Sequence, residues 1–463
     1  MNNETIDRIE RKISYMPFEE RMKVCESKSR QSLSPFKPKL STDYFSNYEL
    51  EYISLKSVTV KSECSSYSDK EKWLYQITRI IRNDNIIGDV TKETVFKFIV
   101  DKQISPQLGY LMLYYRMYYM FTFKSVDLDM NKEFYDKFSV NYIDFVYFAM
   151  LITSILSSSE HTVNEIVNNF GNHFLRIFRE VSMTRTKFIS KNEVLYNGRD
   201  RNDFFDYNLL MSFPIIEQDG FYYCPYLPYI PYACSTSLIY RLTEGNDKLN
   251  GLIGKEVLEG YIMHLLLHSS VTNQYKIIGE FSYGKENKKS PDATVYSDEF
   301  ILFLDSKSTS QSLEFRSNEK DSTIKLKSIV LKHYEQIIKN IASYEKDKFV
   351  SKIPKHENRR VFGMIITKDT IPIELEDELF TDLIENYKKH ISYLNIDYIR
   401  KNIKLTSLVF FENLVINYNS DLKDFLFEVS VIDEKPLVKK FPDFHKFVSD
   451  LAKKTEEYYY KMK

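Results

Sequence analysis

Two aspartates and a lysine in the second half of the sequence have types and spacing that could hold a divalent cation. Asp292 follows Pro291, and Asp305 is separated from Lys307 only by Ser306. Carboxylates are the hard oxygen ligands that Mg2+ and Mn2+ prefer over nitrogen or sulfur. These groups could therefore converge on one ion if the chain folds them together.

The residues before Asp305 predict a strand that would position it. The five apolar residues 300–304 are typical of a strand buried on both faces. A period of two places Asp305 and Lys307 on one face and Ser306 on the other. Charges at the end of a core strand are retained when they pair, bind metal or do chemistry. A surface hairpin with an ordinary ion pair is the alternative, and the apolar run argues against it.

A helix upstream supplies a further carboxylate. Residues 254–267 carry an apolar face at helical spacing, and Glu259 lies at the edge of that face. A carboxylate in that position is either turned to water or aimed at a site. The apolar face consists of Val257, Leu258, Tyr261, Ile262 and Leu265.

Pro291-Asp292 and Asp305-Ser306-Lys307 together resemble the two halves of the motif of the PD-(D/E)xK nuclease superfamily. This superfamily includes many restriction and DNA-repair endonucleases. Many members carry a glutamate on the preceding helix, which corresponds best to Glu259. The resemblance covers roughly residues 246–370 and continues into an expected helix at 325–344 and strand at 360–366.

The resemblance implies an α/β (α+β) restriction-endonuclease-like core and a Mg2+-dependent endonuclease that hydrolyses DNA. Asp292, Asp305, Glu259 and the backbone carbonyl of Ser306 would hold Mg2+ or Mn2+. Lys307 would orient or deprotonate the attacking water and stabilise developing charge.

Three residues of the helix after the motif are candidates for substrate binding. Gln336 is similar to a glutamine that some superfamily members use near the substrate. Lys325 and Lys327 border the expected site and could contact phosphates, although a solvated helix face is an equally good interpretation.

Three other functions stay open at this point. The protein could be a catalytically silent nucleic-acid-binding or scaffolding protein with a nuclease fold, an RNA-directed toxin-like nuclease, or a purely structural interaction protein. An analogy with restriction and anti-phage defence proteins suggests DNA, a second copy of the chain or a defence-system protein as partners.

The organisation of the chain predicts three parts. Residues 1–245 form a mainly helical accessory domain for recognition, sensing or dimerisation, residues 246–415 the nuclease domain, and residues 416–463 a helical C-terminal extension. Within the first part, Asp219-Gly220 between apolar runs predicts a β-hairpin, and the prolines of 224–234 predict extended backbone.

Composition limits the kinds of binding site and the cellular compartment that we expect for this protein. The 463 residues carry a net charge of −1, so nucleic-acid binding must depend on local basic patches. The cysteines lack zinc-ligand spacing, and neither a signal peptide nor a membrane-spanning run is evident, so we expect a cytoplasmic protein without a membrane partner. His264 and His268 are four residues apart on one helix, but no third ligand is evident, and a structural pair is expected.

Overall fold

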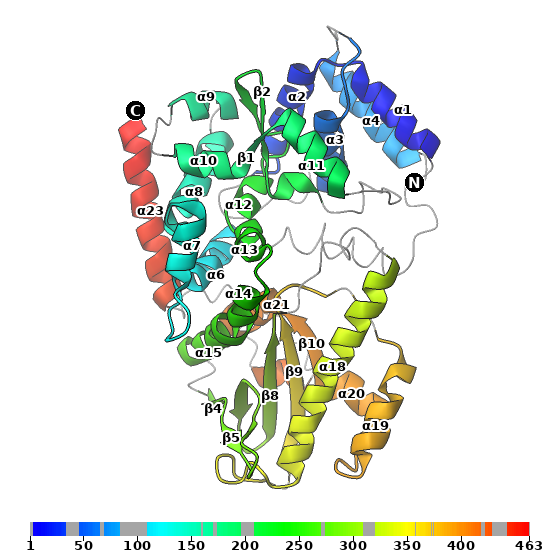
Figure 1. Ribbon diagram of the computed structural model, residues 1–463, viewed down its shortest axis with the longest axis vertical. Coiled ribbons are helices and arrows are strands. Elements are labelled where there is room, and N and C mark those ends of the chain that lie inside the picture. The colour runs from blue at the N-terminus through cyan, green and yellow to red at the C-terminus, as the bar shows by residue number, and fades with distance from the viewer. Residues whose placement is uncertain are drawn as a thin grey trace. The chain divides into compact units, whose positions relative to one another are not determined.

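The protein is described from a computed structural model (Figure 1). The description covers residues 3–33, 46–64, 69–83, 109–158, 161–169, 174–195, 208–269, 274–308, 320–356, 358–371, 373, 375–417, 422–427 and 442–462. Contacts divide the chain into two compact units. The first contains residues 1–245, 316–318 and 447–463, and the second contains residues 246–315 and 319–446.

The expected C-terminal extension, 416–463, is divided between these units. Its residues up to Lys446 belong to the second unit and those from Phe447 belong to the first.

The first unit is mainly helical. Its helices are α1 (Asn3–Ser14), α2 (Phe18–Arg30), α3 (Asn47–Thr59), α4 (Lys70–Asn83), α6 (Tyr110–Thr122), α7 (Met130–Phe138), α8 (Tyr142–Ser158), α9 (Val163–Asn169), α10 (Leu175–Val181), α11 (Arg185–Leu195), α12 (Tyr229–Ala233), α13 (Thr236–Thr243) and α23 (Pro442–Met462) from Phe447. Capping residues determine where several of these helices begin or end. At the start of α7, for example, the Asp129 side chain accepts a hydrogen bond from the backbone N–H of Lys132.

No single helix among the described residues is long and apolar enough to cross a membrane. Helices α7 and α8 meet those criteria only when taken together, and they are bent by 64° relative to each other.

The expected hairpin of the first unit is confirmed. Strand β2 (Ile215–Gln218) pairs antiparallel with β3 (Phe221–Tyr223) and parallel with β1 (Ser182–Thr184). Asp219 and Gly220 between them have φ angles of 54° and 79°, the left-handed backbone that this turn requires.

The expectation of extended backbone in the proline-rich segment is wrong. Residues Tyr229–Ala233 form the short helix α12, which Pro228 precedes. Pro231 lies in its first turn, where a helix has no partner for the backbone N–H that proline lacks. The rings of Tyr226 and Tyr229 are buried with their centroids 4.7 Å apart, so this segment belongs to the core.

A five-stranded mixed sheet forms the centre of the second unit. Its order is β10-β9-β8-β7-β4. The strands are β4 (Lys276–Gly279), β7 (Ala293–Tyr296), β8 (Phe300–Lys307), β9 (Arg360–Thr367) and β10 (Ile403–Ser407). Strand β7 is antiparallel to β4 and to β8, whereas β8, β9 and β10 run parallel to one another. Residues 300–304 of β8 are at most 1% exposed, which confirms the expected buried strand.

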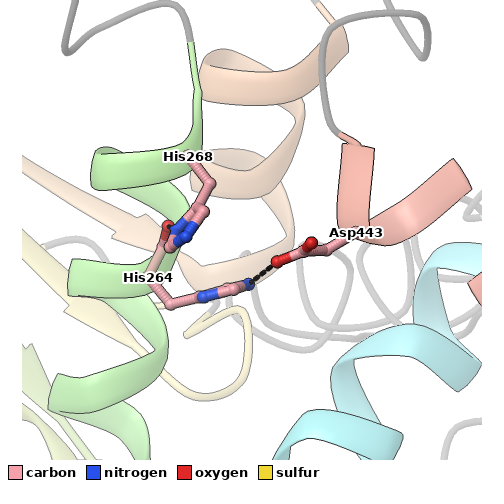
Figure 2. A group of neighbouring side chains, drawn as sticks. All are labelled: His264, His268 and Asp443. Carbon is pink, nitrogen blue, oxygen red and sulfur yellow. Dashed lines mark hydrogen bonds and ion pairs between the residues drawn. The ribbon is translucent and has the colours of Figure 1, made fainter. Parts of the chain in front are cut away.

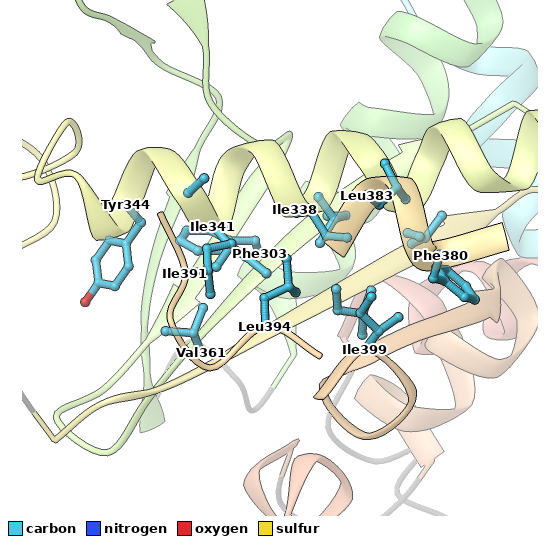
Figure 3. Packing of buried hydrophobic residues seen from close by; sticks show 14 of the residues in the cluster. Phe303, Ile338, Ile341, Tyr344, Val361, Phe380, Leu383, Ile391, Leu394 and Ile399 are labelled. Carbon is cyan, nitrogen blue, oxygen red and sulfur yellow. The ribbon is translucent and has the colours of Figure 1, made fainter. Parts of the chain in front are cut away.

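Helix α18 (Lys320–Glu345) packs on β8 and β9 (Figure 3). Phe303 of β8 and Ile338 and Ile341 of α18 are buried in the same cluster. A glycine permits this approach, because a Cβ atom at Gly363 of β9 would lie 2.4 Å from Cγ2 of Ile337. The remaining helices of this unit are α19 (Thr381–Lys388), α20 (Ile396–Asn402), α21 (Leu408–Glu412) and α22 (Leu422–Leu426).

The expected long helix before the sheet changes its hydrogen-bonding pattern along its length. Helix α14 (Asp247–Leu252) continues into a π-helical segment, Ile253–Leu258, and then into α15 (Glu259–His268). The π segment lies close to the chain just after β8, because a Cβ atom at Gly254 would lie 2.5 Å from Cβ of Ser308. Such π segments are rare and often occur at functional sites.

Candidate active site

Asp305 and Lys307 lie together at the end of β8. Nζ of Lys307 is 3.1 Å from Oδ2 of Asp305, which is completely buried. Apart from Lys307 and the backbone N–H of Asp292, which both lower its pKa, no donor to either Asp305 oxygen is found among the described residues. Burial raises the pKa of Asp305 to about 6, with the positive charge of Lys307 opposing this effect and the negative charge of Asp292 adding to it. A buried carboxylate with so few donors is costly, and its remaining lone pairs could coordinate a cation.

Asp292 is held by Ser306, the residue between Asp305 and Lys307. The backbone N–H and the hydroxyl of Ser306 donate to Oδ2 of Asp292, at 2.6 and 2.8 Å. Because the N–H and C=O of one strand residue point to the same side, the Ser306 carbonyl also points toward Asp292. Burial raises the pKa of Asp292, and the Ser306 hydrogen bonds and Lys307 oppose the rise.

The register of β4 and β7 brings a further carboxylate, Glu280, to the site, and a β-bulge follows it. Gly279 pairs with Ala293, so one more step in that register places Glu280 opposite Asp292. Two residues later Ser282 pairs with Lys289, in the short sheet of β5 (Ser282–Tyr283) and β6 (Lys288–Lys289). The second register leaves one extra residue on the strand of Asp292, where Pro291 has no N–H for the ladder.

The bulge ends the pairing of β4 with β7. The strand is interrupted after Gly279, and Ser282 and Tyr283 belong to the separate two-stranded sheet.

Glu259 completes an acidic cluster. It is the first residue of α15, directly after the π segment. Glu259, Glu280 and Asp292 each offer a carboxylate oxygen, and these oxygens lie within 4.8 Å of one another. Burial, followed by the charges of Asp292 and Glu280, raises the pKa of Glu259 to about 8.

Negative charge exceeds positive charge around this cluster. Lys289 forms an ion pair with Glu280, and this contact raises the pKa of Lys289. With Lys307, two lysines therefore face the four carboxyl groups of Glu259, Glu280, Asp292 and Asp305. Repulsion among these groups favours either protonation or a bound cation. Since every donor is oxygen, the residues fit Mg2+ or Mn2+.

His333 of α18 is also close enough to this site to interact with the charge of Lys307. Burial, followed by the positive charge of Lys307, lowers the pKa of His333 to about 4. His333 is therefore a neutral imidazole at physiological pH, so it adds a polar group near Lys307 without a second positive charge.

The candidate substrate-binding residues lie on α18 but differ in their surroundings. Gln336 and Lys325 are exposed, and no hydrogen bond of the Gln336 side chain is found within the described ranges. Lys327 forms an ion pair with Glu376, so part of its charge is already compensated.

Comparison with protein-family models finds no match, and comparison with curated proteins finds none either. The interpretation of the site therefore depends on its own geometry. Sequence reasoning missed Glu280 and His333. Counting the strand back from Asp292 through the hairpin would have indicated Glu280, whereas the sequence contains no comparable signal for His333.

Proposed function

We propose that this protein is a metal-dependent nuclease of the PD-(D/E)xK type that hydrolyses phosphodiester bonds of DNA. The single observation that carries this proposal is the environment of Asp305. Its carboxylate is fully buried beside Lys307, its charge interacts with that of Asp292, and apart from these two residues no donor to it is found among the described residues. A buried ion pair alone would be expected to have its remaining lone pairs satisfied.

The order of the elements supports the same proposal. A helix with Glu259 is followed by the antiparallel strands β4, β7 and β8, then by α18, and then by the parallel strand β9. This is the order that the resemblance implies for a restriction-endonuclease-like core. It brings the two halves of the motif to one end of adjacent strands.

The cation would be held by Asp292, Asp305, the Ser306 carbonyl and Glu259, with Glu280 close by. A divalent ion supplies charge neutralisation for the scissile phosphate and lowers the pKa of water. Ser306 fixes the orientation of Asp292 through two hydrogen bonds. Lys307 donates hydrogen bonds to the attacking water or the phosphate and stabilises the charge that develops there.

The biological setting follows from analogy. We propose a role in restriction or anti-phage defence in the cytoplasm, with DNA as the substrate and the first unit as the recognition, sensing or dimerisation module. A second copy of the chain or another defence protein would be the partner.

The proposal is tested by incubating the purified full-length protein with supercoiled plasmid in Mg2+ or Mn2+, with and without EDTA. Asp292→Asn, Asp305→Asn and Lys307→Ala are expected to abolish cleavage. The matched control is Asp298→Asn, because Asp298 is exposed in the turn of the same hairpin. Labelled single-stranded DNA and RNA are compared as substrates under the same conditions.

The possible outcomes separate the functions considered. Metal-dependent cleavage of duplex DNA that disappears only in the three site variants supports the proposal, and preferential cleavage of RNA replaces it with the toxin-like function. A protein that binds Mn2+ and nucleic acid but cleaves none of the three substrates is the silent binder. Failure of the parent protein to bind Mn2+ in titration calorimetry rejects the metal site.

A further inference from the structure

Two histidines of one helix and an aspartate of another converge within the second unit (Figure 2). None of the three belongs to the acidic cluster described above. His264 and His268 lie one turn apart on α15, and Asp443 lies in the first turn of α23. The three side chains each offer a donor atom, and these atoms lie within 4.8 Å of one another. Asp443 is the third ligand that the sequence did not indicate.

The contacts within this group are close but do not form a compact hydrogen-bonded network. Nε2 of His264 is 3.9 Å from Oδ2 of Asp443, beyond the usual length of a hydrogen bond. The imidazole rings of His264 and His268 have their centroids 4.3 Å apart. Burial and the neighbouring His268 lower the pKa of His264, and the charge of Asp443 raises it by less than they lower it. An ion pair with Asp443 is therefore not the dominant contribution at His264.

Neighbouring contacts orient both rings. Nδ1 of His268 lies 2.9 Å from the backbone carbonyl oxygen of His264, which can only accept, so Nδ1 carries the hydrogen and Nε2 carries the lone pair. The Tyr261 ring stacks on His264 at 6.5 Å and 19°, and its hydroxyl donates to the buried Glu412 at 2.9 Å. Contacts of this kind commonly fix the rings of histidine ligands.

We propose that His264, His268 and Asp443 bind one transition-metal ion, with Zn2+ as the best fit, which joins the first turn of α23 to α15. Two ligands of a tetrahedral Zn2+ are about 3.3 Å apart, given metal–ligand bonds of about 2.0–2.1 Å. The 3.9 Å separation of His264 and Asp443 needs only a small side-chain adjustment to reach that value.

The chemistry of this site differs from that of the acidic cluster, although Glu259 and the two histidines share α15. Imidazole nitrogens select Zn2+, Co2+ or Ni2+, whereas carboxylates without nitrogen donors suit Mg2+ and Mn2+. Three protein ligands leave one tetrahedral position for water. The proposal therefore does not depend on the nuclease function and survives if that function is rejected.

The test measures Zn2+ binding by full-length protein purified without a polyhistidine tag. The background is Cys64→Ser, because Cys64 is an exposed thiol that could itself bind Zn2+. Competition with a chromophoric chelator gives the stoichiometry and Kd, and the visible spectrum of the Co2+ form reports its coordination. The site variants are His264→Ala, His268→Ala and Asp443→Asn. The controls are His356→Ala, which removes an exposed histidine, and Asp292→Asn, which disrupts the acidic cluster.

We expect one Zn2+ per chain in the parent and both controls. Each site variant should raise Kd by at least about 100-fold, more than the loss of an outer partner usually costs. The metal-free melting curves should stay close to that of the parent, which excludes misfolding as the cause. Unchanged Kd in any one of the three variants would overturn the three-ligand site. Loss of Zn2+ binding in Asp292→Asn alone would assign the ion to the acidic cluster instead.

Discussion

Ser306 donates two hydrogen bonds to one oxygen of Asp292, from its backbone N–H at 2.6 Å and from its hydroxyl at 2.8 Å. The middle residue of the Asp-x-Lys half of the motif therefore positions the aspartate of the other half. The backbone bond is independent of the side chain, but the hydroxyl bond is a property of serine. The two halves of the motif are consequently coupled within the metal-free protein.

Replacement of Ser306 tests this coupling. Ser306→Ala removes the hydroxyl bond and keeps the backbone bond, so we expect Asp292 to be held less firmly. The Mg2+ concentration for half-maximal cleavage should rise by about 10- to 100-fold, as for other outer partners of metal ligands. Ser306→Thr, which keeps a hydroxyl, should recover part of the loss. Ser297→Ala, in the turn of the same hairpin, is the control, and an equal effect there would argue against the positioning role.

The raised pKa of Glu259 makes the metal-free protein less stable as the pH rises. Below pH about 4.5 the carboxyl group is protonated in both folded and unfolded chains, so it carries no penalty. Between that pH and the folded pKa of about 8, the unfolded chain ionises first, and stability is lost. Glu259→Gln should therefore raise Tm in EDTA at pH 8 and leave it nearly unchanged at pH 4.

Metal binding should reverse the loss of stability that ionisation of Glu259 causes in the parent protein as the pH rises. Mg2+ favours the ionised carboxylate, so the gain in Tm on adding Mg2+ should grow as the pH rises from 6 to 8. Glu259→Gln should show a smaller gain. Equal pH dependence of parent and variant in thermal unfolding would contradict the raised pKa.

Lys307 has an electrostatic effect on Asp305 that can be separated from the catalytic role proposed for it. Its charge opposes the burial that raises the pKa of Asp305, so Lys307→Met should raise that pKa above about 6. Mn2+ binding by the variant should then weaken near pH 6 and recover at higher pH, where Asp305 ionises again. Cleavage should fall by about 100- to 10,000-fold and should not recover with pH. Full recovery of cleavage at pH 8.5 would reduce Lys307 to an electrostatic role.

Gly363 of β9 sets the distance between α18 and the sheet. In Gly363→Ala the new Cβ would lie 2.4 Å from Cγ2 of Ile337, so overpacking should cost about 1–3 kcal/mol in denaturant unfolding. Ile337→Ala removes that methyl group, so the double variant should lose less stability than the sum of the single changes. Gly251→Ala is the control, because that helical glycine has no heavy atom within 4 Å of the added Cβ, and it should be neutral or stabilising.

The sequence predicted the parts of the second unit that depend on local pattern. The apolar run 300–304 indicated β8, because a strand buried on both faces is apolar at every position. The contact between Asp305 and Lys307 follows from the period of two of a strand.

The positions of Glu280 and Asp443, which the sequence did not indicate, depend on contacts between segments that are separate in the sequence. Glu280 lies opposite Asp292 because of the register between β4 and β7, and the pairing register of two strands is not visible in apolar periodicity. Asp443 meets His264 across nearly 180 positions of sequence, and no local pattern connects them. The segment 224–234 was wrongly expected to be extended because its prolines were counted without regard to their place in a helical turn.

The π-helical segment Ile253–Leu258 holds one residue more than the same stretch of α-helix would, because its hydrogen bonds close at i→i+5. Each residue of an α-helix advances the side-chain direction by about 100°, and a π turn accommodates its extra residue by advancing less per residue. Deleting the exposed Lys255 should therefore let the segment close as α-helix and largely keep the direction of Glu259 relative to α14. Related chains that keep the site should accordingly differ in length here by at most this one residue, with α-helix in its place.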